Sequence, residues 1–313
     1  MENSTIAHPP LEFLYGHLLF KGTPALQAEE RGPLKQFLVD QKAVEDSNMF
    51  LPNLTHIKDF ASYAYLNACS DSQLKRWDCR VCRHVPDATF VTSFDNYIQG
   101  ARGYLAVDHA RNRIICSFRG MADTRNKLEA QDIIRSPLSY ANESEVTVAS
   151  GFLHTMESLD FLLPLKKLVI DNRYLTYKVA FIGHSLGGAF ASLALTKAQA
   201  ILNIDWKRLE LYTYGQPRTG NTNFARWYNR KPIASARVVN NTDPIPHLTG
   251  TTVTDYRHHM NELWIQGPHN DYRLNICSND QLEDPDCSIS TSPLNYVKAN
   301  HQMYFDIDFF QAC

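Results

Sequence analysis

The sequence predicts an α/β fold with a doubly wound, mostly parallel central sheet flanked by helices. Strand-like and helix-like segments alternate from about residue 55 onward, which is typical of strands joined by crossover helices. Several strand-like segments are short, continuous apolar runs, as in sheets buried on both faces. With 313 residues, 44% of them hydrophobic, the chain can bury a large core.

The expected elements follow in a regular order. Apolar side chains recur at helical spacing from Leu54 to Ala68. The later elements are strands over 89–94, 104–107 and 113–118, a long amphipathic helix over 151–171, a strand over 177–182, a helix over 186–200, a strand over 209–214, a helix over 223–229, and strands over 234–240 and 262–265. No repeat or long linker interrupts residues 55–313, which predicts one domain of catalytic size.

Charge and hydropathy exclude two classes of protein. Lys and Arg number 31 against 33 Asp and Glu, and this net charge of −2 lacks the basic surface of a nucleic-acid binder. Mean hydropathy is −0.34 and no apolar run is long enough to span a bilayer, so we expect no integral membrane segment. Residues 1–52 have mixed polarity and are expected to form a leader or propeptide-like extension before a catalytic domain over 53–313.

Seven cysteines suggest a disulfide framework with one free thiol. Cys116 lies in an apolar run and is expected to be that buried thiol. Cys79 and Cys82 could form half of a zinc or redox site, but no second pair with matching spacing is present, so structural disulfides are favoured. Disulfides imply an oxidising compartment, and we expect secretion.

Two further sequence signals bear on secretion. The N-terminus shows no clear signal peptide, because Glu2 makes its start acidic. Four Asn-x-Ser/Thr sites would permit glycosylation: Asn3, Asn53, Asn142 and Asn240.

The segment Gly183-His184-Ser185-Leu186-Gly187 carries the strongest chemical signal. In a G-x-S-x-G turn the serine lies between a strand and a helix, with its oxygen above the edge of the sheet. The pattern alone is weak, but an apolar strand precedes Ser185 and a small-residue helix follows it. This context predicts a nucleophilic serine, which needs a histidine base and an orienting carboxylate.

The carboxylate and the histidine should follow the serine in the chain. Asp243 comes after the strand over 234–240 and before a proline-rich stop, where it could orient a histidine or equally cap a turn. Several histidines lie downstream: His247, His258, His259, His269 and His301. The segment Asn300 to Phe305 could be a short loop that enters a last helix, and this position favours His301.

At this point the sequence resembles the fungal-type class 3 triacylglycerol lipases, from about Leu54 to Cys313. The resemblance rests on a series of ordered motifs: Gly103-Tyr104-Leu105-Ala106-Val107-Asp108, Phe118-Arg119-Gly120, Gly151-Phe152, Ile182 to Gly188, Gly215-Gln216-Pro217-Arg218-Thr219-Gly220-Asn221, Asp243-Pro244-Ile245-Pro246, His258 with Glu262-Leu263-Trp264-Ile265, and His301 with Tyr304-Phe305. It implies an α/β-hydrolase fold with a short helical lid.

The resemblance also implies roles for individual residues. Ser185 would be the nucleophile, Asp243 the orienting carboxylate and His301 the general base, with His258 structural. The oxyanion hole would consist of the backbone N–H groups of Met121 and Leu186. The implied disulfides are Cys69–Cys313, Cys79–Cys82 and Cys277–Cys287. No metal or organic cofactor is implied.

Three positions depart from the family pattern. Met121 stands where relatives carry serine or threonine, so it keeps the N–H group but lacks the hydroxyl. The expected lid over 122–132 has Leu128 as its only large apolar residue, whereas helices that bind lipid surfaces need a wide apolar face. Ala149 replaces a histidine of the family.

These observations leave three hypotheses. The first is a secreted serine ester hydrolase that cleaves acylglycerols, with a lipid or ester substrate and a possible lipid–water interface as partner. The polar lid keeps open a non-lipid carboxylesterase or feruloyl-type esterase on the same fold. Met121 and Ala149 motivate the third, a catalytically impaired, lipase-like binding protein.

Overall fold

The computed structural model describes residues 56–120, 134–248, 255–268 and 271–313, which belong to one unit of the chain, residues 37–313. The expected extension over 1–52, Met121 and the expected lid over 122–132 lie outside the described residues, so these expectations and the domain boundary stay predictions. Within the described part of the chain, no helix combines the length and the apolar character needed to cross a membrane.

An eight-stranded sheet forms the centre of the described unit, with strand order β1-β2-β3-β6-β7-β9-β11-β12. Its strands are β1 (Ala88–Asn96), β2 (Ala101–Asp108), β3 (Arg113–Phe118), β6 (Lys178–His184), β7 (Leu209–Tyr214), β9 (Ala234–Asn240), β11 (Glu262–Gln266) and β12 (Arg273–Ile276). The five strands from β3 to β11 are parallel, and antiparallel strands complete both edges. The predicted mostly parallel sheet is therefore confirmed.

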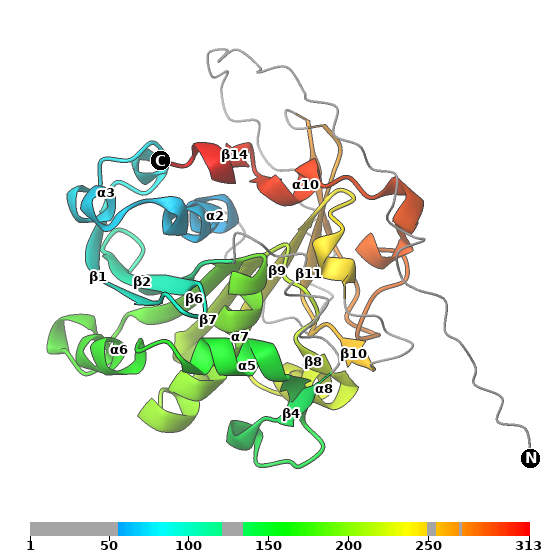
Figure 1. Ribbon diagram of the computed structural model, residues 1–313, viewed down its shortest axis with the longest axis horizontal. Helices are drawn as coiled ribbons and strands as arrows, with labels where there is room; N and C mark the ends of the chain where they lie inside the picture. The colour runs from blue at the N-terminus through cyan, green and yellow to red at the C-terminus, as the bar shows by residue number, and fades with distance from the viewer. Residues whose placement is uncertain (1–55, 121–133, 249–254, 269–270) are drawn as a thin grey trace, which may run out of the picture. The chain divides into compact units, whose positions relative to one another are not determined.

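Helices cover both faces of this sheet, as Figure 1 shows. One face packs against α5 (Ser150–Glu157), α6 (Leu162–Val169), α7 (Leu186–Leu202) and α8 (Thr222–Asn229). The other packs against α2 (Ile57–Tyr65), the turn η3 (Leu66–Ala68) and the end of the chain. The central strands are buried on both faces, which explains why their sequences are continuous apolar runs rather than alternating ones.

The predicted single helix over 151–171 is wrong, because the structure divides it into α5 and α6. Pro164 gives the physical reason. Proline lacks a backbone N–H group and clashes with the preceding turn, so it is tolerated only in the first turn of a helix. Accordingly α6 begins at Leu162, two residues before the proline.

Short elements that the sequence analysis did not predict surround the main sheet. A second sheet joins β4 (Arg135–Pro137), β5 (Thr147–Ala149), β8 (Gly220–Asn221) and β10 (Tyr256–Arg257). Near the end of the chain, α10 (Ala299–Gln302) leads into the hairpin of β13 (Met303–Tyr304) and β14 (Ile307–Asp308). The expected final helix after His301 is therefore wrong: hairpin and turn η11 (Phe309–Gln311) occupy that place. Among the described residues, the remaining α-helix is α3 (Asp71–Arg76).

Candidate active site

Ser185 lies in the sharp turn between β6 and α7, as the G-x-S-x-G pattern predicted. Its backbone has φ 58° and ψ −133°, a conformation that residues with a side chain rarely adopt. The peptide N–H of Ser185 donates to the carbonyl oxygen of Tyr214 at the end of β7, at 2.9 Å. The turn is therefore attached to the edge where the parallel strands end.

Two glycines make this turn possible because backbone approaches them closely. A Cβ atom on Gly183 would lie 2.0 Å from the carbonyl oxygen of Gly187. A Cβ atom on Gly187 would lie 2.2 Å from the carbonyl oxygen of Phe118 in β3. Any side chain at either position would thus push the helix away from the sheet.

Asp243 follows β9 and is completely buried. Its Oδ2 accepts hydrogen bonds from His301 Nδ1 at 2.9 Å and from the Tyr304 hydroxyl at 2.6 Å. Its Oδ1 accepts from the backbone N–H of Ile245 at 2.8 Å. Burial by itself would raise the pKa of Asp243, but the charge of His301 and these hydrogen bonds outweigh it and lower the pKa. The carboxylate is therefore held ionised.

His301 lies in α10, and its Nδ1 atom contacts Asp243. Its side chain is 12% exposed, so the ring can meet a ligand. A Cβ atom on Gly215, directly after β7, would lie 2.7 Å from Asp243 Oδ2 and 2.8 Å from His301 Nδ1. Gly215 follows Tyr214, the residue that binds the Ser185 turn. Serine, carboxylate and imidazole therefore meet around the end of β7.

The contacts of the other candidate histidines distinguish them from His301. The Nε2 atom of His258 lies 2.8 Å from the carbonyl oxygen of Pro246, and burial lowers the pKa of His258 well below its ordinary value. The ring of His259 stacks on Tyr228. His247, which the structure also describes, stacks on Tyr296. His269 lies outside the described residues. Among the described histidines, only His301 contacts the carboxylate of Asp243.

The oxygen of Ser185 is buried and makes no hydrogen bond within the described residues, His301 included. Contacts between a nucleophile and its base commonly tighten only when the substrate binds. Gly120 lies directly against this turn: a Cβ atom there would be 2.9 Å from Ser185 Cβ and 3.5 Å from the backbone nitrogen of Leu186. The strand that leads to Met121 thus ends beside Ser185 and the first N–H group of α7.

Three polar residues of the site were missed as site residues by the sequence analysis. Tyr304 binds Asp243, and its place three residues after His301 was the available signal. The Nε2 atom of His184 lies 2.7 Å from the carbonyl oxygen of His301. Asn240 Nδ2 donates to the carbonyl oxygens of Asn300 and Met303, at 3.1 and 2.7 Å. No signal in the sequence would have identified these last two.

The burial of Asn240 makes it an unsuitable glycosylation site in the folded chain. The side chain is only 3% exposed, and its amide nitrogen is used in the two hydrogen bonds to Asn300 and Met303. A glycan on that nitrogen could not be accommodated in the folded chain. Asn142, by contrast, is exposed. Asn3 and Asn53 lie outside the described residues.

Comparisons with known proteins agree with this geometry. The family model for "Lipase (class 3)" matches residues 115–253. A lipase of Rhizomucor miehei is 34% identical over 233 residues, 74% of this chain and 62% of the relative. The structure of the Rhizomucor miehei triacylglyceride lipase is similar with a TM-score of 0.70 and 30% identity, over 84% of this chain and 98% of that one. The chain belongs to the class 3 lipase family.

The predicted α/β-hydrolase fold of this class 3 lipase is thereby confirmed. A "secreted mono- and diacylglycerol lipase 1" of Fusarium solani is 34% identical over 168 residues, 54% of this chain and 48% of the relative. The chain thus spans less than two thirds of the full length of these curated relatives.

Three disulfides fix the class 3 lipase fold, and they are the pairs that the family resemblance implied: Cys69–Cys313, Cys79–Cys82 and Cys277–Cys287. Cys116 is the free cysteine, and its burial raises the pKa of its thiol well above the usual value. The bridge from Cys69 ties the turn after α2 to the segment that follows His301.

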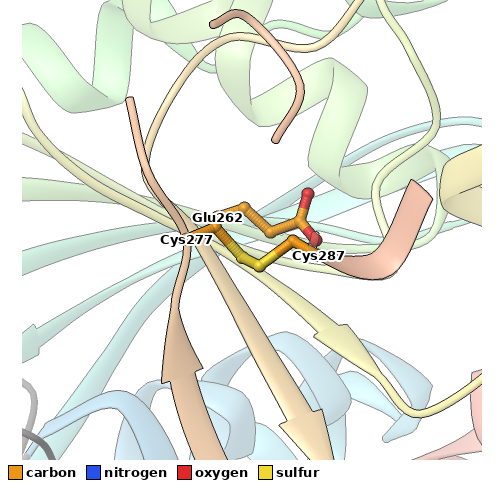
Figure 2. A group of neighbouring side chains, drawn as sticks. All are labelled: Glu262, Cys277 and Cys287. Atoms are coloured by element: carbon orange, nitrogen blue, oxygen red, sulfur yellow. A yellow bond between two sulfur atoms is a disulfide. The ribbon is translucent and has the colours of Figure 1, made fainter. Parts of the chain in front are cut away.

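Glu262, Cys277 and Cys287 form the one group among the described residues whose atoms lie close enough together to suggest a metal site (Figure 2). The two sulfur atoms are bonded to each other, so neither is a thiolate ligand. The Glu262 carboxylate accepts from Arg237 Nη2 at 2.6 Å and from the Ser288 N–H at 3.0 Å. Both sulfur atoms and both carboxylate oxygens therefore already have partners, so this group is not a candidate metal centre.

Proposed function

We propose that this class 3 lipase is a serine ester hydrolase that cleaves acylglycerols, triacylglycerols among them, and that residues 53–313 form its catalytic domain. The observation that carries the proposal is the buried Asp243–His301 pair at the strand edge where Ser185 occupies its strained turn. A serine in such a turn, beside an imidazole held by a carboxylate, is the arrangement used for acyl transfer.

In the first half-reaction, His301 takes the hydroxyl proton of Ser185 on Nε2 while Oγ bonds to the ester carbonyl carbon. The carbonyl oxygen becomes an oxyanion. When the tetrahedral intermediate collapses, the alcohol oxygen leaves with the proton from His301, and the acyl group stays on Ser185. Asp243 orients the ring through Nδ1 and stabilises the imidazolium that forms.

In the second half-reaction, His301 deprotonates a water molecule that attacks the acyl carbon, and the fatty acid leaves as Ser185 regains its proton. The oxyanion would accept hydrogen bonds from the backbone N–H groups of Leu186 and Met121. Leu186 is the first residue of α7, where the N–H groups lack helical partners and the helix dipole favours negative charge. The position of Gly120 beside that nitrogen supports the pairing.

We further propose that the chain is secreted and acts on a lipid or other ester at a lipid–water interface, without a metal or organic cofactor. The three disulfides support an oxidising compartment. The Fusarium relative, called a secreted lipase, supports the same location. The triacylglyceride lipase of Rhizomucor miehei and the mono- and diacylglycerol lipase of Fusarium solani support acylglycerols as the substrate class.

The test compares Ser185→Ala with the matched variant Ser192→Ala on emulsified triglycerides of graded chain length. Ser192 lies in the same helix, and its hydroxyl contacts only the carbonyl oxygen of Ala189 among the described residues. We expect Ser185→Ala to lose about 10⁶-fold in kcat and Ser192→Ala to retain activity. Full activity of Ser185→Ala would contradict the proposal.

The polar sequence of the segment over 122–132 keeps a non-lipid esterase as the second candidate. Activity confined to short or aromatic acyl groups, without a gain above the solubility limit of the substrate, would favour that candidate. Labelling of Ser185 by a fluorophosphonate probe distinguishes either enzyme from an impaired binding protein, because only an activated serine reacts rapidly.

A further inference from the structure

His184 lies beside both residues of the proposed proton transfer, Ser185 and His301. It directly precedes Ser185 in the chain, it is the last residue of β6, and it is 6% exposed. Its Nε2 lies 2.7 Å from the carbonyl oxygen of His301. A carbonyl oxygen can only accept a hydrogen bond, so the hydrogen of His184 lies on Nε2 and is donated. The side chain beside the nucleophile therefore binds the backbone of the base.

Aromatic neighbours fix the ring of His184. It stacks on the ring of His301, with centroids 4.5 Å apart and planes 28° apart. Phe309 stacks on it at 5.6 Å and 29°, and Tyr65 packs against it at 5.1 Å. Because these contacts leave the ring little freedom, the direction in which Nε2 donates is defined.

The helix that carries His301 needs external support. α10 has four residues, and a single helical turn is not stable in isolation. Side chains from the ends of the sheet strands hold carbonyl groups of this helix and of the residue that follows it: Asn240 binds those of Asn300 and Met303, and His184 binds that of His301. Asp243 contacts the ring of His301 but not this carbonyl.

The charge of His184 suits this position. Burial, together with the positive charge of His301, lowers the pKa of His184 to about 3, although its hydrogen bond to the His301 backbone and the nearby Asp243 act in the opposite direction. His184 is thus neutral at the pH where His301 must accept a proton, and it does not repel the imidazolium stacked against it.

We propose that His184 is a positioning residue for His301: its hydrogen bond to the His301 carbonyl fixes the helical turn that presents the base to Ser185. The inference rests on the proposed function, which assigns the base to His301. His184 occupies the first variable position of the G-x-S-x-G turn. The end of β6 would then position both reacting residues: its backbone leads directly into Ser185, and the His184 side chain binds the backbone of His301.

Two substitutions separate the hydrogen bond from the packing. His184→Gln keeps an N–H donor, and His184→Phe keeps an aromatic ring without a donor. With a soluble short-chain ester we expect the Phe variant to lose about 10-fold in kcat at unchanged KM, the equivalent of one hydrogen bond. The acid limb of its kcat/KM profile should move to lower pH, because a loosened His301 loses part of the stabilisation by Asp243. The Gln variant should retain most of kcat.

Ile114→Val in β3 is the control for a general loss of stability, since Ile114 is fully buried in the core cluster beneath α5–α8 and belongs to none of the site contacts described above. With a comparable fall in Tm it should leave kcat and the pH profile unchanged. Wild-type kcat and pH profile in the Phe variant, or equal losses in the Phe and Gln variants, would overturn the proposal.

A measurement on the wild-type chain does not depend on whether the variants fold. Nitrogen-15 NMR of the imidazoles should find His184 neutral, with its hydrogen on Nε2, between about pH 5 and 8. A neutral Nδ1–H tautomer in that range would overturn the proposal, because Nε2 would then have no hydrogen to donate. Wild-type protein without ester hydrolase activity would instead contradict the proposed function, and the NMR result would still decide whether His184 donates to His301.

Discussion

Tyr304 donates its hydroxyl hydrogen to Asp243 Oδ2 at 2.6 Å, the same oxygen that receives His301 Nδ1 at 2.9 Å. The tyrosine is completely buried, and burial beside this carboxylate raises its pKa far above the usual value, so it stays a donor at any working pH. The carboxylate thus has two side-chain donors on one oxygen and a backbone donor on the other.

Tyr304→Phe should therefore destabilise the fold and slow the reaction. The lost hydrogen bond to a charged acceptor corresponds to about 1.5–3 kcal/mol of unfolding free energy. Without it the pKa of Asp243 rises and kcat should fall. The matched control is Tyr104→Phe, whose buried hydroxyl donates to the neutral carbonyl of Tyr63 at 2.8 Å. It should cost about 1 kcal/mol and leave kcat unchanged. Equal kcat values for the two variants in a steady-state assay would contradict the prediction.

Two of the three disulfides should differ in their contribution to stability. Cys69–Cys313 spans 244 residues and Cys277–Cys287 spans 10. In the chain-entropy model their removal costs about 5 and about 3 kcal/mol respectively. Urea unfolding of the two double Cys→Ser variants measures the difference. A larger loss for the short loop would disagree with an entropic origin.

Thiol titration of the denatured, unreduced chain should find one free group, Cys116.

Acid should destabilise the fold before the carboxylates titrate. Burial lowers the pKa of His258 well below its ordinary value and that of His259 to about 3, with the charge of Arg237 as a further cause. Below about pH 6.5 the unfolded chain protonates both histidines and the native chain does not, so the free energy of unfolding decreases as pH falls. The maximum slope is about 1.4 kcal/mol per pH unit for each histidine.

Urea unfolding between about pH 6.5 and 5 tests this dependence. His259→Gln removes one titrating group, so its slope should be lower by about one proton. Stability that is constant across this window would show that the histidines are already protonated in the native state.

A buried ion pair should matter far more than an exposed one. Arg218 and Glu283 are 3% and 9% exposed and form two contacts, at 2.7 and 3.0 Å. Glu283→Gln removes the carboxylate charge that faces a buried arginine and should cost about 3 kcal/mol or more. Glu143→Gln breaks the exposed pair with Arg230 and should cost less than about 1 kcal/mol. Thermal unfolding of both variants would show whether burial decides the difference.

Glycosylation should distinguish the two described sequons. In a host that adds N-linked glycans, mass spectrometry of peptides should find a glycan on exposed Asn142 and none on Asn240 of active protein. A glycan on Asn240 in folded, active enzyme would mean that its two hydrogen bonds to the His301 segment are dispensable.

The sequence predicted the sheet better than the surroundings of the site. The predicted strands over 113–118, 209–214 and 234–240 agree with β3, β7 and β9 because a strand buried on both faces leaves a continuous apolar run. The predicted helix over 151–171 is wrong because its apolar period continues across the break, so only Pro164 marks the place where α6 begins.

The candidate site was predictable where local geometry demands particular residues. The Ser185 turn needs glycine at positions where backbone atoms approach within 2.0–2.2 Å, and this leaves a pattern in the sequence. The choice between His258 and His301 could not be derived from spacing, because it depends on the path of the segment 267–300 in space. The donors Asn240 and His184 belong to strand ends whose partners lie 60 or more residues away.

The segment from Asn300 to Tyr304 supplies both the imidazole and the hydroxyl donor that meet Asp243. Since ribosomes make chains from the N-terminus, the residues of the sheet, the serine turn and the carboxylate are all synthesised before this segment. Ester cleavage should thus be one of the last properties that the nascent chain acquires. A nascent chain that ends before Asn300 would carry Ser185 and Asp243 but would lack the imidazole that the proposed ester cleavage needs.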